Sequence, residues 1–524
     1  MINRFFNTAG PCRSEDHYML PPMDRLPQVG RIIDQKGYFV IHAPRQTGKT
    51  TAMLALAREL TASGRYVSAL VSMEVGAAFN DLGAAELAIL KLWRDVTDWQ
   101  LPVELQPPSW PTAPAGQRIG TALAAWAKVA PCPLVLFLDE IDSLRDVVLL
   151  SVLRQLRAGY PGRPQAFPWS VALIGLRDVR DYKVASGSSE RLHTASPFNI
   201  KVRSLTLQNF SADEVSALYQ QHADESGQPF TPEATRRAFE LTQGQPWLVN
   251  ALAYVITEEL LPGDQTPITT AHVDQAKEIL IARQDTHLDS LAERLREPRV
   301  RHVIEPMMAG RALGDVPPDD IRFVLDLGLC RMDPAGGLVV TNPIYREVLP
   351  RVLATTSFAS LPHIQPTWLR PDGRLDKERL LDAFLVFWRQ HGQPLLKSAP
   401  YHEIAPHLVL MAFLHRVANA GGTLEREYAI SSGRMDICLR YGPALGEAKG
   451  PDTLAMELKV WRDGESDPLK QGLDQLDGYL GGLTLESGWL VIFDQRSNQP
   501  PISERTTTEQ ATTGRGRAVT VIRA

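Results

Sequence analysis

Eight consecutive residues near the start of the chain have the spacing of a loop that binds phosphate groups. They are Ala43, Pro44, Arg45, Gln46, Thr47, Gly48, Lys49 and Thr50, with Thr51 following. In such a loop the backbone N–H groups point inward at phosphate oxygens, and glycine lets the backbone approach closely. Lys49 can reach the β- and γ-phosphates, and Thr50 can offer its hydroxyl to Mg²⁺. The spacing therefore predicts a site for ATP and magnesium.

Two acidic residues that can complete this site follow a continuous apolar run. Residues 134–138 read Leu-Val-Leu-Phe-Leu, and Asp139 and Glu140 come directly after them. Such a run is typical of a strand buried on both faces. Asp139 is expected to hold the Mg²⁺ shell, and Glu140 to orient or deprotonate the attacking water. The same pair alone would also fit an ordinary strand end, so its meaning depends on the phosphate loop.

Two further candidates for this site have equally good structural explanations. Arg177 and Arg180 follow the strand-like run 169–174, where an arginine can contact the γ-phosphate or can form a surface ion pair in a turn. The turn 244–246 (Gly-Gln-Pro) interrupts a helical pattern and can bring Pro246 against the nucleotide. Gly and Pro also mark simple helix boundaries, so that alternative stays open.

The elements around the loop alternate between strand and helix. The first 35 residues have no periodic pattern and are interpreted as an irregular lead-in. Strands are expected over 38–41, 66–71, 134–138 and 169–174, with a helix over 49–60 and a surface loop over the proline-rich 102–115. This alternation predicts an α/β fold whose mostly parallel sheet is covered on both sides.

The rest of the chain changes character twice. Helical patterns dominate from about 210 to 283, a mixed segment extends to about 353, and residues 357–371 look like a linker. Beyond the linker, helices are expected over 377–390, 404–418 and 468–480, and strands over 434–439, 454–460, 489–493 and 518–522. This order predicts a separate C-terminal α/β domain.

That C-terminal region contains a second set of residues that can do chemistry. Asp436 stands in one expected strand, and Glu457 and Lys459 stand in the next. Side chains two apart on a strand share a face. Paired carboxylates suit Mg²⁺, and a nearby lysine can steady or deprotonate the attacking water. The set predicts cleavage of phosphodiester bonds.

Two other interpretations bear on this second site. Residues 447–449 also read Glu-x-Lys, but they are flanked by glycines and lack a strand pattern, so they are interpreted as a turn. Asp436, Glu457 and Lys459 can also be ordinary charged residues on strand edges.

Residues 5–353 resemble the AAA-like ATPases of bacteria, close to the signal-transducing STAND class. The matching stretches are APRQTGKTT, LVLFLDEID, LIGLRDVRDYK, SPFNI, GQPWLVNALA, THLDSLAERL and NPIYREVLPRVL. The resemblance implies an ATPase core over 1–209, a helical lid over 210–283 and a winged-helix-like module over 284–356. The strict motif has glycine where this chain has Ala43, and related ATPases tolerate that change.

After a linker over 357–374, residues 375–524 resemble the PD-(D/E)xK nuclease superfamily. The matching pattern is Asp436 and then Glu457-x-Lys459, with a helix before it and a helix after it. The resemblance implies a restriction-endonuclease-like α/β domain that uses Mg²⁺, with Mn²⁺ as an alternative. It also implies a metal-binding role for Glu403 upstream and a catalytic role for Gln475, four residues before Tyr479.

Composition and length agree with several ordinary globular domains. The chain has 524 residues, 44% hydrophobic and 22% charged, and at about 150 residues per domain this predicts three or four domains. Four cysteines lie far apart without a CxxC pair, which fits a reducing compartment and gives no zinc site. No apolar run approaches the roughly 18 residues of a membrane span, and the start has no signal-peptide pattern. A cytoplasmic protein without a membrane partner is expected.

Charge qualifies the expectation of a nucleic-acid partner. The net charge of the chain is −5, and residues 371–524 hold 18 Lys and Arg against 20 Asp and Glu, a net of −2. A domain that binds DNA unaided should be basic. Nucleic acid, DNA rather than RNA, remains the expected substrate, held with help from the winged-helix-like module, a homo-oligomer or a protein partner.

Two hypotheses of different classes follow. The first is an ATP-regulated, metal-dependent nuclease, for which defence against mobile elements is a plausible context by analogy. The second is a nucleotide-dependent signalling switch or DNA-binding regulator whose nuclease-like domain binds without cutting. A DNA motor is disfavoured, because the sequence shows no recognisable helicase motif beyond the two nucleotide-binding elements.

Overall fold

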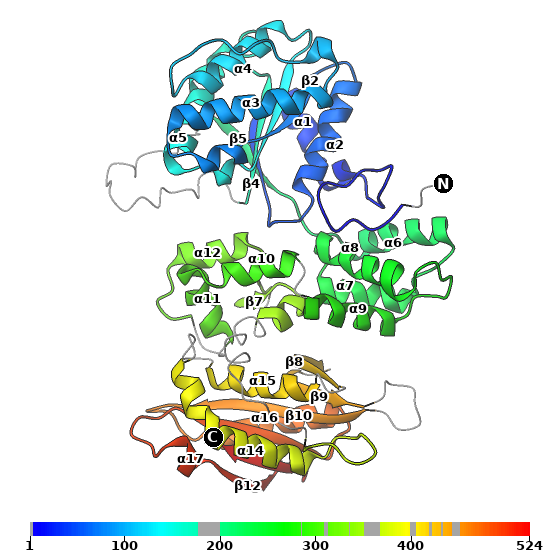
Figure 1. Cartoon of the computed structure of the whole chain (residues 1–524), viewed down its shortest axis with the longest axis vertical. Coiled ribbons are helices and arrows are strands. Elements are labelled where there is room, and N and C mark those ends of the chain that lie inside the picture. The colour runs from blue at the N-terminus through cyan, green and yellow to red at the C-terminus, as the bar shows by residue number, and fades with distance from the viewer. Residues whose placement is uncertain are drawn as a thin grey trace. The chain divides into compact units, whose positions relative to one another are not determined.

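The continuous apolar runs of the N-terminal third form a parallel sheet, as predicted (Figure 1). A computed structural model of the chain describes residues 4–176, 200–283, 286–308, 313–334, 336–349, 367–398, 405–418, 422–430, 433–442 and 451–524. Residues 1–287 with 322–331 form one compact unit, and residues 288–321 with 332–524 form another.

The sheet of the first unit has five strands in the order β2-β3-β4-β1-β5, and every neighbouring pair is parallel. The strands are β1 (Tyr38–His42), β2 (Val67–Ser72), β3 (Leu134–Asp139), β4 (Ser170–Gly175) and β5 (Lys201–Thr206). Because parallel strands all point the same way, their carboxyl ends meet at one edge, and there the residues of both predicted nucleotide-binding motifs begin.

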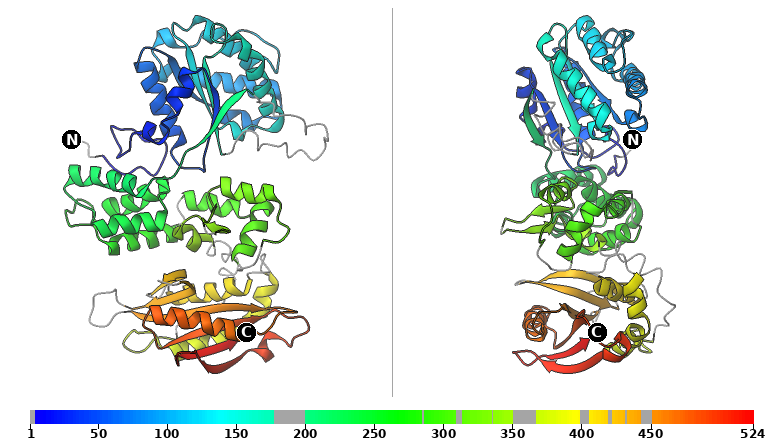
Figure 2. Two further views of the ribbon diagram at one scale, coloured as in Figure 1. Left: turned by 180° about the vertical axis from the view of Figure 1, so that it is seen from behind. Right: turned by 90° about the vertical axis from the view of Figure 1, so that its left-hand side faces the viewer.

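Helices cover both faces of this sheet, which explains why its inner strands are apolar throughout. One face packs against α1 (Val29–Asp34) and α2 (Lys49–Ala62), and the other against α3 (Leu82–Gln100), α4 (Arg118–Val129) and α5 (Asp146–Gly159). Within β1, Phe39 and Ile41 belong to the α1–α2 core, whereas Tyr38 and Val40 belong to the α3–α5 core. Figures 1 and 2 show the helices on the two sides.

Short 3₁₀ helices connect these elements, and one lies where the sequence predicted an irregular lead-in. They are η1 (Pro22–Arg25), η2 (Glu74–Ala78), η3 (Val103–Leu105), η4 (Ile141–Ser143) and η5 (Tyr160–Gly162). Both η1 and α1 fall within the first 35 residues, so that segment is more structured than expected. These elements were missed because four to six residues are too few to show a helical period.

Helices follow the sheet along the chain. A helical bundle contains α6 (Ala212–Ser226), α7 (Pro232–Thr242), α8 (Pro246–Tyr254), which continues as a π-helical turn (Val255–Leu260), and α9 (Thr270–Arg283). Ser211 and Thr231 accept hydrogen bonds from backbone N–H groups at the starts of α6 and α7. Next come α10 (Thr286–Arg294), α11 (Pro298–Met308), α12 (Pro318–Asp326) and a two-stranded sheet of β6 (Cys330–Met332) and β7 (Leu338–Val340).

The C-terminal part of the second unit is a second α/β layer. Its six-stranded mixed sheet has the order β12-β13-β11-β10-β9-β8. The strands are β8 (Gly422–Ile430), β9 (Gly433–Tyr441), β10 (Asp452–Trp461), β11 (Ser487–Asp494), β12 (Thr507–Thr512) and β13 (Ala518–Arg523). The neighbours β10 and β11 are parallel and are joined by a helix, as a crossover connection requires.

Helices cover the two faces of this second sheet differently. Residues of α14 (Lys377–Ser398), α15 (Ala405–Ala418) and the short α17 (Ile502–Arg505) share one core with the sheet, and α16 (Leu469–Gly482) shares the other. Along β10, Leu454, Met456 and Leu458 belong to the α14–α15 core, and Ala455 belongs to the α16 core. None of the described helices is both long and apolar enough to cross a membrane.

Candidate functional site

The phosphate loop lies between β1 and α2, with Lys49 as the first residue of α2. Gly48 has φ 88°, a left-handed conformation that glycine adopts without the strain a side chain would cause. Gln46 also has a positive φ, of 58°. Ala43 is buried in the α1–α2 core, where its methyl group is accommodated, so the departure from glycine has a simple packing explanation. The loop therefore ends on a helix N-terminus, where backbone N–H groups favour an anion.

The Lys49 ammonium group lies folded against this loop. Its Nζ donates hydrogen bonds of 2.7 Å to the carbonyl oxygens of Ala43 and Pro44. Burial lowers the pKa of Lys49 to about 8, although the carboxylates of Asp139 and Asp142 oppose that shift. An anionic phosphate would offer this cation a stronger partner than two neutral carbonyls. The geometry suits a lysine that binds phosphate.

A hydroxyl and a carboxylate meet beside the lysine. Thr50 Oγ1 donates a hydrogen bond of 2.7 Å to Asp139 Oδ2, and the Glu140 N–H donates to the other oxygen, Asp139 Oδ1, at 2.9 Å. Asp139 is only 5% exposed, and burial raises its pKa against the effect of these two hydrogen bonds. Hard oxygen ligands of this kind are those that Mg²⁺ prefers. Thr50 and Asp139 thus fit the predicted magnesium shell.

Glu140 follows Asp139 in a left-handed conformation, with φ 56°. Its Oε2 accepts a hydrogen bond of 2.7 Å from Ser72 Oγ, at the end of the neighbouring strand β2. Burial raises the pKa of Glu140; the Ser72 hydrogen bond opposes this shift, and the nearby Glu74 carboxylate adds to it. A carboxylate with a raised pKa is suited to accept a proton. The parallel register of β2 and β3 places Ser72 beside Asp139. Sequence patterns did not predict Ser72, because its role depends on this register.

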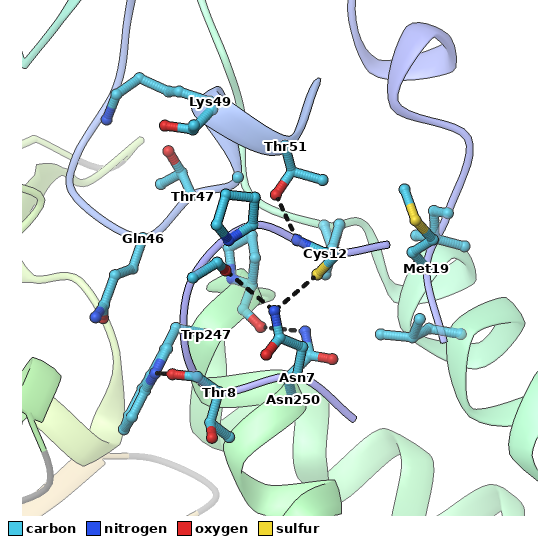
Figure 3. A pocket seen from close by; sticks show the side chains of 18 of the residues that line it. Asn7, Thr8, Cys12, Met19, Gln46, Thr47, Lys49, Thr51, Trp247 and Asn250 are labelled. Atoms are coloured by element: carbon cyan, nitrogen blue, oxygen red, sulfur yellow. Dashed lines mark hydrogen bonds between the residues drawn. The ribbon is translucent and has the colours of Figure 1, made fainter. Parts of the chain in front are cut away.

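A cavity of about 410 Å³ opens beside the loop (Figure 3). Its walls come from residues 46–51, from the N-terminal segment between Asn7 and Leu20, and from α8. The Cys12 N–H donates to Thr51 Oγ1 at 3.1 Å, and Trp247 Nε1 donates to the Thr8 carbonyl at 2.8 Å. The N-terminal segment thus connects the start of α2 to the helical bundle. The role of this N-terminal segment was not predicted, because a segment that folds against distant elements shows no periodic pattern.

The turn 244–246 also lies at this cavity. Pro246 lines the wall, and Gln245 Nε2 donates to the carbonyl of Gln46 at 3.4 Å. Contact of Pro246 with a nucleotide remains a prediction. Arg45 is exposed and is not among the residues that line the cavity. Arg177 and Arg180 lie outside the described residues.

The second predicted site centres on β10. Glu457 is 2% exposed, and Lys459 Nζ lies 2.6 Å from its Oε1. Both residues alternate with the α14–α15 core residues Met456 and Leu458, so they share the face on which α16 packs. A buried carboxylate beside a lysine is therefore present where the sequence placed one.

The other members of this site are described only in part. The last pair between β9 and β10 joins Ile437 to Met456, so Asp436 and Glu457 are the next positions along the two strands. The Asp436 side chain and the whole of Glu403 lie outside the described residues. Gln475 is a half-buried residue of α16. Among the side chains that are described, three or more His, Cys, Asp or Glu residues nowhere gather as metal ligands do.

Comparison with known proteins gave structural neighbours only. No family model matches the chain, and no curated protein matches it. A Walker-type ATPase of Pyrococcus abyssi is similar over 66% of this chain and 99% of its own, with 13% identity and a TM-score of 0.47. The RuvB Holliday junction branch migration motor of Thermotoga maritima is similar over 62% of this chain and 92% of its own, with 15% identity and a TM-score of 0.34.

At these identities and TM-scores, the geometry of the site itself must identify the class of protein. Strand β1 leads into a phosphate loop and then α2, and β3 places a carboxylate on the hydroxyl of Thr50. These features, on a five-stranded parallel sheet, define a P-loop ATPase fold in the first unit. This fold supports a nucleotide-dependent activity.

Proposed function

We propose that the chain is an ATP-regulated, Mg²⁺-dependent nuclease that cleaves nucleic acid, with DNA as the favoured substrate. The observation that carries the proposal is a P-loop site and a buried Glu457–Lys459 pair in one chain. Magnesium and manganese are both suitable for the second site. We also propose that the protein belongs to the STAND class and that it acts in defence against mobile elements.

The ATP half of the proposal assigns a task to each residue of the loop. The N–H groups of residues 46–50 and the Lys49 ammonium bind the phosphates, and Thr50 and Asp139 hold the magnesium ion. When bound, that ion neutralises charge on the phosphates. Glu140, with its raised pKa, orients or deprotonates the water. Hydrolysis of ATP, or release of the nucleotide, then changes the conformation of the ATPase unit.

The nuclease half assigns metal binding to carboxylates on two neighbouring strands. Asp436 and Glu457 provide oxygen ligands for a divalent ion, with Glu403 as a further candidate. Lys459 stabilises negative charge on the phosphodiester or steadies the water, and Gln475 assists from α16. The element order supports this proposal, because α15 precedes the strands that carry Asp436 and Glu457-x-Lys459, and α16 follows them, as in the PD-(D/E)xK pattern.

The negative net charge of the C-terminal region suggests that another part of the assembly helps to bind the nucleic acid. Its net charge of −2 over residues 371–524 gives little attraction for a phosphate backbone. We therefore assign part of the binding to the winged-helix-like module over 284–356, to a homo-oligomer or to a protein partner. The same charge favours the second candidate function, a nucleotide-dependent switch or regulator that does not cut.

Cleavage assays on the full chain separate the two candidates. Purified protein with Mg²⁺ would be incubated with plasmid, linear duplex, single-stranded DNA and RNA. We expect cleavage by the wild type and a loss of at least about 100-fold in Lys459→Ala, because a group that stabilises transition-state charge contributes on this scale. Lys470→Ala, which changes an exposed lysine of α16, is the control and should cut normally. Absence of cleavage on every substrate, with ATP still bound, would favour the regulator.

A further inference from the structure

A half-buried arginine outside all the predicted motifs contacts the phosphate loop and lines the same cavity. Arg25 ends η1, and its Nη1 donates to the Thr47 carbonyl at 3.3 Å. Its Nη2 donates to the carbonyl of Gln208, in the segment that connects β5 to α6. The guanidinium also lies over the ring of Phe210, 4.7 Å from the ring centroid. One side chain therefore joins the loop to the connection between the sheet and the helical bundle.

The cation of Arg25 is retained although the side chain is partly buried. Burial lowers its pKa to about 10, with Glu214 opposing the shift, so the group stays charged near neutral pH. Burying a charge is costly unless it is paired or hydrogen-bonded. Two carbonyls and an aromatic face supply the compensation here. The contacts of Arg25 thus hold it in one position.

The connection continues from Phe210 to the bundle and back to the loop. The Phe210 N–H donates to the Gly244 carbonyl at 2.8 Å. Gly244 has φ +71°, and a Cβ atom there would lie 1.8 Å from the Phe210 carbonyl oxygen, so the two backbones touch. The next residue, Gln245, donates to the carbonyl of Gln46 in the loop. The contacts form a closed ring through loop, connection and bundle.

The planarity of the peptide bond gives this ring a direct link to phosphate binding. The Thr47 carbonyl shares a rigid plane with the Gly48 N–H, and the Gln46 carbonyl shares one with the Thr47 N–H. In a trans peptide these groups point in opposite directions. Arg25 and Gln245 hold the two carbonyls, so they also fix where the two N–H groups point.

We propose that Arg25 is a positioning residue that orients the phosphate-binding N–H groups and couples their occupancy to the helical bundle α6–α9. The proposal rests on the nucleotide binding proposed above. When a phosphate binds the Gly48 N–H, the peptide plane that includes the Thr47 carbonyl rotates or becomes fixed. Arg25 transmits this change in the peptide plane to residues 207–211 and to the turn 243–246.

Hydrogen exchange of the full chain with and without Mg²⁺-ATP tests the coupling. In the wild type we expect ATP to slow exchange in residues 207–211 and 243–246 by at least about fivefold, the lower end of typical coupling. Arg25→Gln should abolish this ATP-dependent difference and weaken binding of fluorescent ATP. Arg25→Lys should recover part of the ATP affinity, because it keeps the positive charge. It should not recover the protection from exchange, because an ammonium group cannot replace the two guanidinium nitrogens that bond the Thr47 and Gln208 carbonyls.

Control variants distinguish coupling from general damage. Arg31→Gln changes an exposed arginine of α1 and should behave as the wild type. If Arg25→Gln does not fold, Phe210→Leu takes its place as the test. This variant keeps Arg25 but removes the aromatic ring beneath it, and it should reduce the ATP-dependent protection. If Arg25→Gln shows the same ATP-dependent protection as the wild type, the proposed coupling is wrong. It is also wrong if Arg31→Gln loses as much of this protection as Arg25→Gln does. Failure of the wild type to bind ATP would instead contradict the proposed nucleotide site.

Discussion

At the scale of single residues, the nucleotide site depends on contacts that local sequence shows only in part. Residues 43–51 and Asp139–Glu140 were recognised because each motif is continuous and each follows a strand. Ser72 and Arg25 were not recognised. Each is a common residue type, and its place beside Glu140 or Thr47 depends on strand register and on chain segments far apart.

Lys49 gives a prediction for the pH dependence of ATP binding. Its lowered pKa, about 8 in the free protein, means that the ammonium loses its proton as pH rises through that value. Phosphate binds the charged form, so we expect ATP affinity to be constant below about pH 7 and to fall above pH 8, by up to tenfold per pH unit. Titrations with fluorescent ATP from pH 6.5 to 9.5 would measure this.

Lys49→Arg is the matched control for that titration. An arginine stays charged across the whole range, so the variant should bind ATP with little pH dependence even where its affinity is lower. The same fall in affinity above pH 8 in both proteins would show that another group is responsible.

At the scale of helices and strands, burial decided which elements could be predicted. The inner strands of the first sheet are buried on both faces and read as apolar runs. Five of the six residues of the edge strand β12 and three of the six in the edge strand β5 are exposed, so neither strand shows a continuous apolar run. In the second sheet β8 is the other edge strand, and it was also missed. Exposure explains why β5 and β12 were missed, because β2, an edge strand with five of its six residues buried, was predicted over 66–71.

The contact between the β5–α6 connection and the α7–α8 turn gives a prediction for stability. Gly244→Ala would introduce a Cβ atom 1.8 Å from the Phe210 carbonyl oxygen, in a left-handed conformation. We expect a loss of more than about 2 kcal/mol in the free energy of unfolding of the first unit, from backbone strain together with the clash. Urea unfolding of the full chain, followed by tryptophan fluorescence, would measure it.

Gly263→Ala separates the two causes. Gly263 has φ +70°, almost the same as Gly244, but no atom lies within 4 Å of its Cβ position. That variant should lose only the conformational part, about 1 kcal/mol. Equal losses in the two variants would mean that the close approach at Phe210 does not contribute to stability.

At the scale of the whole molecule, the proposed function places two kinds of chemistry in one chain. The first unit has a P-loop ATPase fold, and the second contains a mixed sheet with a buried carboxylate and a lysine on one face. A nuclease that carries its own nucleotide switch can remain inactive until a signal changes the nucleotide state. The sequence predicted both α/β layers, since each has its own apolar runs, but side chains brought together by folding had to come from the structure.

The most direct test of the account is the ATP dependence of cleavage. The rate of plasmid cleavage by the full chain with Mg²⁺ would be measured with and without ATP, for the wild type and for Lys49→Ala. We predict that ATP changes the wild-type rate by at least about fivefold and leaves the rate of Lys49→Ala unchanged. Lys128→Ala, at an exposed lysine of α4, should respond as the wild type does. Cleavage that responds to ATP equally in the wild type and Lys49→Ala, or in neither, would contradict the account.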